Sequence, residues 1–403
     1  MGCFGFQELF SFLRKRQRRD APPACSETGG DAATVGYGNH PSPPYRPALS
    51  STPSPPLTLS PSLTRSPSLT HAPSLPHFLQ LPADIVVYLS REHLPPASAA
   101  ALSLTCKALF GLIFPGARRG LEVDASARQD LQLLLEKDLG HSWWYCQGCS
   151  LLHPVSTRGP AGGGMINGGC KIHPNVFDLA RPHHSQKFLD GSGFNIDYQS
   201  VRLAMNRHFF GPPNGLPLEN FEVEAISTSS LLPWQETWSA RILQDELFLS
   251  ATRTLSSAGW DDEAFRAALD SDWREICGHL RVSTQVTQPY YIKALRRPSP
   301  TSANIFTPCR NVVDSCRQCL ADYATTVERK REDANKACGG EKQPTEYWMI
   351  TLTSYYRLGS GRSHQDPKWT EFGRWGTACT IGLRRDMAAY PRGAVKAVWD
   401  KAR

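Results

Sequence analysis

The sequence predicts an α+β protein whose folded part begins near Leu81. Residues 20–76 consist mostly of Pro, Ser, Thr, Gly and Ala, so we expect a disordered arm with too few large apolar residues to offset the entropy of ordering. After Leu81, long apolar residues appear at helical spacing. Later segments rich in β-branched and aromatic residues have the character of strands, and further helical segments lie between them.

Three short helices are expected directly after the arm. The first covers residues 83–91 and ends at Leu94-Pro95-Pro96, because proline supplies no backbone amide. Ser98 is expected to cap the second helix. The third starts near Cys106 and is expected to end at Pro115-Gly116. A unit this short cannot bury all of its apolar surface by itself.

From residue 127 onward we expect one mixed α+β domain. Ser126-Ala127-Arg128-Gln129 has the pattern of a capping box, which predicts the start of a helix. The other expected elements are an aromatic strand at 143–146, a helix at 200–209, a strand at 238–252, a helix at 263–269, a charged helix at 327–337 and a strand at 347–355.

Composition narrows the class of protein. The formal net charge is +7, and much of the excess comes from the run Arg14-Lys15-Arg16-Gln17-Arg18-Arg19, so no nucleic-acid partner is expected. No apolar stretch is long enough to span a bilayer, and the first residues lack the pattern of a secretory signal. We therefore expect the cytoplasm or the nucleus, where cysteines are thiols or metal ligands.

Three blocks of the helical segment resemble the F-box. They are Leu81-Pro82-Ala83-Asp84-Ile85, Leu94-Pro95-Pro96-Ala97-Ser98 and Leu102-Ser103-Leu104-Thr105-Cys106-Lys107-Ala108-Leu109. The resemblance implies a three-helix module over residues 78–117 that docks on the Skp-type adaptor of a Skp, cullin and F-box ubiquitin ligase. The residues it implies at this interface are Leu81, Pro82, Ile85, Leu94, Leu102, Leu104, Cys106, Lys107 and Leu109.

The rest of the chain resembles fungal F-box proteins that share a cysteine-bearing C-terminal domain. The similar segments are 145–149 with 152–153, 205–208, 276–280, 316–319, and 358–363 with 366–369. The resemblance implies an adaptor, not an enzyme, in which the domain at 127–403 presents an unknown target protein for ubiquitination. It leaves a short apolar and basic segment at residues 1–19 ahead of the arm.

Two Cys-x-x-Cys pairs predict bound zinc in a structural role. Two intervening residues let both thiolates of a pair reach one tetrahedral ion. The leading ligands are Cys146, Cys149, Cys316 and Cys319, and the further candidates are Cys170, His173, Cys277 and His279. Because the pairs are far apart in sequence, the fold has to bring distant segments together, and the number and grouping of sites stay open.

Two alternatives to the adaptor stay open. One is a zinc-dependent or redox enzyme that carries an F-box-like helical hairpin, although the sequence contains no His-Glu-x-x-His motif and neither Cys pair has a βαβ context. The other is a membrane-tethered regulatory protein outside any ligase. Gly2-Cys3 before the basic run resembles a dual-acylation anchor, with Phe6 where Ser or Thr is usual, so membrane association is expected only through this segment.

Overall fold

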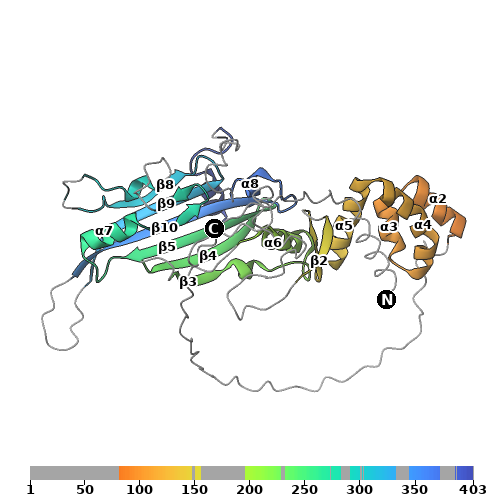
Figure 1. Cartoon of the computed structure of the whole chain (residues 1–403), viewed down its shortest axis with the longest axis horizontal. Helices are drawn as coiled ribbons and strands as arrows, with labels where there is room; N and C mark the ends of the chain where they lie inside the picture. The colour runs from red at the N-terminus through yellow and green to blue at the C-terminus, as the bar shows by residue number, and fades with distance from the viewer. Residues whose placement is uncertain are drawn as a thin grey trace, which may run out of the picture.

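The computed structural model describes residues 81–147, 150–155, 196–227, 232–272, 274–282, 291–299, 302, 304–332, 345–372, 386 and 388–402. In these residues the chain is a mixed α+β protein, which confirms the predicted fold class at that level. The expected N-terminal segment at 1–19 and the arm at 20–76 lie outside the described residues. Figure 1 shows an elongated arrangement with helices α2–α5 at one end and the large sheet at the other.

The four helices at one end, which we call the helical unit, share one hydrophobic core. They are α2 (Ala83–Glu92), α3 (Pro96–Ser103), α4 (Lys107–Val123) and α5 (Ala125–Leu139). Leu121 from α4 and Leu131 from α5 are fully buried in this core together with Val86 and Ile113. The helix after the three predicted ones is therefore part of the same packed unit.

The caps of α3 and α5 differ from the prediction. α3 begins at Pro96 and not at a Ser98 cap, because proline suits the first helical position, where no amide partner is needed. α5 begins one residue before the predicted capping box. Its cap is Asp124, whose carboxylate accepts a hydrogen bond from the backbone nitrogen of Ser126 at 2.8 Å.

The third predicted helix does not end at Pro115-Gly116. α4 continues through Pro115 to Val123. Proline inside a helix costs about 3 kcal/mol because it removes one hydrogen bond and crowds the carbonyl four residues earlier. Here the apolar face continues beyond the proline with Ala117 and Leu121, both buried against the other helices, and this packing outweighs the local preference.

A small hairpin and one helix lie between the helical unit and the sheet (Figure 1). β1 (Trp143–Cys146) and β2 (Leu151–Pro154) pair antiparallel, which confirms the aromatic strand. α6 (Tyr198–Phe210) contains the predicted helix at 200–209 and is capped by Asp197, which accepts from the backbone nitrogen of Ser200 at 2.7 Å.

The large sheet has six antiparallel strands in the order β3-β4-β5-β10-β9-β8. Its strands are β3 (Val223–Ser227), β4 (Trp234–Leu243), β5 (Glu246–Ser256), β8 (Cys309–Ser315), β9 (Ala321–Glu332) and β10 (Thr345–Gly359). The smaller elements are η2 (Leu218–Phe221), α7 (Asp262–Asp270), β6 (Glu275–Cys277), β7 (Leu280–Arg281), η3 (Lys293–Leu295), α8 (Pro367–Thr370) and α9 (Ala394–Lys401). The predicted helix at 263–269 and strand at 347–355 lie within α7 and β10 and are confirmed.

Two predictions about the sheet are wrong. The single strand expected at 238–252 is the hairpin of β4 and β5, which turns at Gln244 and Asp245 with φ of 54° and 57°. Neither residue is the glycine or asparagine that usually marks such a turn. The charged helix expected from 327 is the end of β9 as far as residue 332, while 333–337 lie outside the described residues. Pairing with β10 along the whole strand overrides the helical preference of its charged residues.

The main core lies on one face of the sheet. Trp234, Trp238 and Trp348 are buried there among residues from α6, α7 and the β6–β7 hairpin. The opposite face is covered at one end by α9, whose Trp399 packs against Tyr355. Cys277, Cys316 and Cys319 belong to this main core.

Candidate metal centre

The turn between β8 and β9 carries two of the predicted zinc ligands. Cys316 and Cys319 directly follow β8, and the backbone nitrogen of Cys316 donates to the carbonyl of Ala321 at 2.9 Å, which closes the turn. The backbone nitrogen of Gln318 donates to the sulfur of Cys316 at 3.4 Å. This loop therefore presents both sulfurs to the same side and stabilises one of them as an acceptor.

The hairpin of β6 and β7 carries the other two side chains of the candidate site, Cys277 and His279. Cys277 ends β6, and His279 lies in the turn before β7, so one residue separates them. Their Sγ and Nδ1 atoms are 4.0 Å apart. The hydroxyl of Tyr356, from β10, donates to the carbonyl of Ile276 at 2.7 Å and so fixes the strand just before Cys277.

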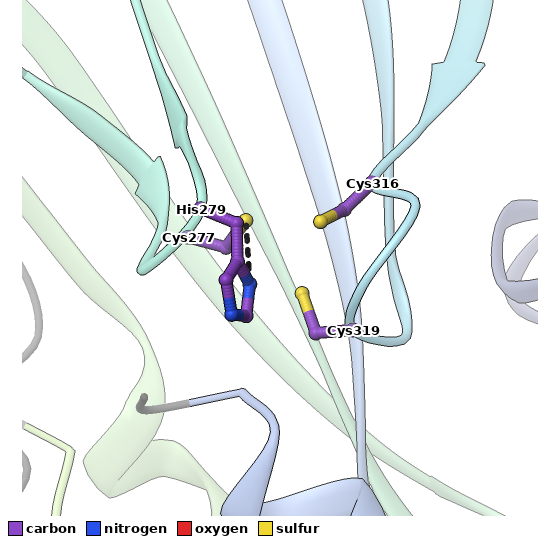
Figure 2. Close-up of side chains that lie close together, drawn as sticks. All are labelled: Cys277, His279, Cys316 and Cys319. Atoms are coloured by element: carbon purple, nitrogen blue, oxygen red, sulfur yellow. Dashed lines mark hydrogen bonds between the residues drawn. The ribbon is translucent and has the colours of Figure 1, made fainter. Parts of the chain in front are cut away.

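The two hairpins face each other in the core (Figure 2). One ligand atom from each of Cys277, His279, Cys316 and Cys319 lies within 4.8 Å of all the others. Zinc at about 2.3 Å from each thiolate separates two sulfurs of a tetrahedron by about 3.8 Å, so the four side chains are already near this arrangement. Three thiolates and one imidazole are a donor set typical of structural zinc.

Burial and mutual hydrogen bonding divide the three thiols. Hydrogen bonds from Cys277 and Cys319 hold the pKa of Cys316 well below its usual value. Burial raises the pKa of Cys277 and of Cys319 well above the ordinary value. A bound cation would displace the protons of the thiols that it coordinates.

The cluster is closed to solvent. Each of the four side chains is buried, the most exposed being His279 at 7%. Tyr323 lines the site from β9, and its pKa is raised, first by burial and then by the nearby Asp314. These surroundings leave four protein ligands around one point in a dry core, which favours a structural ion over a site for substrate.

The predicted ligands are only partly brought together. Cys316 and Cys319 lie with Cys277 and His279, which were predicted only as further candidates. Cys146 lies in β1, in a separate cluster with Trp144, Leu151 and Leu203. Cys149, Cys170 and His173 lie outside the described residues. The signal for the second half of the site was the short Cys-x-His spacing, which is too common to identify a ligand pair without the fold.

The predicted partner residues lie on the helical unit, with different exposure. Leu81, Pro82, Ile85 and Lys107 are exposed, whereas Leu94, Leu102, Leu104 and Cys106 are half-buried and Leu109 is buried inside the unit. Tyr88, which the F-box pattern did not single out, is 57% exposed. Ile85 and Tyr88, three residues apart on α2, and Leu81, which lies just before the helix begins at Ala83, are large apolar side chains exposed to solvent.

None of the helices in the described part of the chain has the length and apolar character needed to cross a bilayer. Comparisons with protein-family models, curated proteins and solved structures give no match to this chain.

Proposed function

We propose that this chain is an F-box adaptor: the helical unit binds a Skp-type protein of a cullin ubiquitin ligase, and the sheet domain presents a target protein that is still to be identified. The observation that carries the proposal is a group of exposed apolar residues at the start of α2: Ile85 and Tyr88 on the helix, and Leu81 just before it begins. It begins at the Leu-Pro pair that resembles the start of an F-box.

The exposure of these side chains supports a docking role. In a helix that only covers a core, such residues point inward, and Val86 of α2 does so. Leu81, Ile85 and Tyr88 instead stay 40%, 42% and 57% exposed. A helix that exposes large apolar residues at i and i+3, with a further one beside its first turn, offers a surface to a hydrophobic groove of a partner.

Zinc is the second part of the proposal. Cys277, His279, Cys316 and Cys319 would hold it, and it would join the β6–β7 hairpin to the turn after β8. A catalytic zinc keeps one coordination position open for water or substrate, whereas four buried protein ligands fill a tetrahedron. This ligand set favours the adaptor over the alternative of a zinc-dependent enzyme.

Binding to a purified Skp-type protein, measured by calorimetry, tests the adaptor role. Ile85→Glu and Tyr88→Ala are expected to weaken binding by about 30-fold or more, because loss of a buried anchor costs about 2 kcal/mol or more. Val123→Glu is the matched control, since Val123 is an exposed apolar residue at the far end of α4. Unchanged binding in the α2 variants, or no binding by the natural chain, would contradict the proposal.

A further inference from the structure

The helical unit and the sheet end of the chain have separate hydrophobic cores. We call the part from α6 to α9 the sheet unit. The apolar contact near the boundary is small: Trp144, Cys146 and Leu151 of the β1–β2 hairpin pack against Leu203 of α6. So few contacts do not by themselves define a single orientation of the two units.

A buried carboxylate of the helical unit reaches across this boundary. Glu136 of α5 is 1% exposed. Its two oxygens accept from Arg202 Nε at 2.8 Å and from Arg202 Nη2 at 2.5 Å. Oε1 also accepts from Asn206 Nδ2 at 2.9 Å and from the backbone nitrogen of Tyr145 at 3.0 Å. Two helices and the first strand of the hairpin therefore meet at one side chain.

Arg202 extends the same network to the loop after β10. Its Nη1 donates to the backbone carbonyls of Gly361 at 3.3 Å and of Arg362 at 3.1 Å. The hydroxyl of Tyr198 donates to the Gly361 carbonyl at 2.8 Å. Gly361 adopts φ of 64°, and a Cβ atom there would lie 3.3 Å from the Cα of Arg202, so the loop lies directly on α6.

A second set of hydrogen bonds also crosses the boundary between the two units. Gln147, just after β1, donates from Nε2 to the Arg362 carbonyl at 2.9 Å and accepts from the backbone nitrogen of His364 at 2.7 Å. The backbone nitrogen of Gly215 donates to the Gly140 carbonyl at 3.2 Å. These bonds join the hairpin and the end of α5 to the sheet unit at separate points.

The network is directional in a way that apolar packing is not. Removing two charges from water costs several kcal/mol per ion, so a buried pair contributes little net stability unless its geometry is satisfied. Here the bidentate Arg–carboxylate geometry fixes both distance and angle, and the remaining hydrogen bonds of both groups are made within the same site. Rotation of the helical unit would break several of these bonds at once in a dry environment.

We infer that the Glu136–Arg202 pair is an orienting lock that holds the helical unit, and with it the exposed face of α2, in one orientation relative to the sheet. The pair selects this orientation more than it stabilises either unit. The inference goes beyond the adaptor proposal, because it holds whatever molecule binds the α2 face.

A distance measurement in the full chain tests the lock. Spectroscopic labels carried by noncanonical amino acids at Arg119 on α4 and Thr237 on β4, both exposed, report the separation of the two units without use of the native cysteines. The natural chain is expected to give one narrow distance distribution. Arg202→Met is expected to broaden or shift it, because the Glu136 carboxylate is then left buried without its cation.

A double variant separates orientation from folding. Glu136→Leu with Arg202→Leu removes both charges, so the chain is expected to fold with an unchanged circular dichroism spectrum while the distance distribution broadens. The control is Arg118→Met with Glu122→Gln, which removes a surface pair at 3.1 Å within α4 and is expected to leave the distribution unchanged. A double-leucine chain that keeps the narrow distribution, or one that does not fold at all, would overturn the inference.

Discussion

Gln318 donates its backbone N–H to the sulfur of Cys316, two residues earlier, at 3.4 Å. The turn that carries Cys319 therefore also stabilises negative charge on Cys316. Of the three cysteines in the cluster, Cys316 is the one whose pKa is lowered, and hydrogen bonds from Cys277 and Cys319 are the main cause. It is the ligand that the fold prepares best for a cation, and it gives the sharpest test of the metal centre.

Cys316→Ser is expected to abolish stoichiometric zinc in the purified chain and to lower its thermal stability, because a three-ligand remnant no longer closes the tetrahedron. Elemental analysis and a melting curve measure the two effects. Cys309→Ser is the matched control: Cys309 begins β8, seven residues before Cys316, and lies outside the cluster. Equal zinc loss in both variants would mean that the four residues are not the site.

Tyr356→Phe tests whether the Tyr356 hydroxyl positions the β6–β7 hairpin for metal binding. The variant removes only the hydroxyl that donates to the Ile276 carbonyl at 2.7 Å, one residue before Cys277. We expect zinc to remain bound with an affinity lower by about 10-fold, as for the loss of other groups that orient ligands. Competition with a chelator measures this change. Tyr347→Phe, on the same strand but outside the core, should leave the affinity unaltered.

Leu131→Ala tests whether α5 belongs to the helical unit. Leu131 is fully buried between α5 and the other helices, so the cavity is expected to cost about 2–5 kcal/mol of the free energy of unfolding. Urea denaturation gives this value. Leu134→Ala, at a half-buried position of the same helix, is expected to cost less. A cost for Leu131→Ala well below about 2 kcal/mol would contradict the placement of α5 in this core.

The sequence predicts a helix well where a single apolar periodicity runs through the segment, and less well where another local signal conflicts with it. The interval 83–91 and α2 differ by a single residue, because Pro82 and the Pro95-Pro96 pair bracket it. Pro115 misled the prediction for α4, since only the packed structure reveals that Leu121 continues the buried face. β9 was missed because its charged end at 328–332 has helical character, and only its pairing with β10 reveals it as a strand.

The candidate metal centre was half predictable for a similar reason. The Cys316 and Cys319 spacing is itself a ligand pattern, so two of the four residues could be named from the sequence. Their partners Cys277 and His279 lie about forty residues earlier, and no local rule joins them. Glu136 and Arg202 carried no signal at all, because a charged residue on a predicted helix is normally solvated.

Gly215→Ala is expected to destabilise the chain strongly at the junction between the two units. A Cβ atom there would lie 1.9 Å from the Leu203 carbonyl oxygen, and φ is 69°. Gly211→Ala is the matched control, because Gly211 also has a positive φ, 75°, but no atom lies within 4 Å of its added Cβ. The control carries only the backbone cost of its glycine-only conformation, φ 75° and ψ 170°, which is about 1–3 kcal/mol. Melting curves that coincide for the two variants would contradict the close contact.

Glu246 predicts how stability depends on pH. Burial alone would raise its pKa, but hydrogen bonds from Arg357, at 2.5 Å, and from Lys368 outweigh this effect and lower the pKa. A carboxyl whose pKa is lower in the folded chain than in the unfolded chain stabilises the fold above its unfolded pKa. This contribution is lost as the pH falls through the folded pKa.

Glu246→Gln is therefore expected to be less stable than the natural chain near pH 7, and the difference should shrink as the pH is lowered to about 3, because the contribution of the carboxylate is lost as the pH falls through its lowered folded pKa. Urea midpoints at both pH values measure it. Any metal ion released in acid would be lost from both chains and would cancel in the difference. Glu346→Gln is the control, because Glu346 pairs with Arg329 at the surface and should change the midpoint little at either pH. A Glu246→Gln difference that grows toward low pH would show that the carboxylate destabilises the fold, because the cost of its burial would then exceed the gain from Arg357 and Lys368.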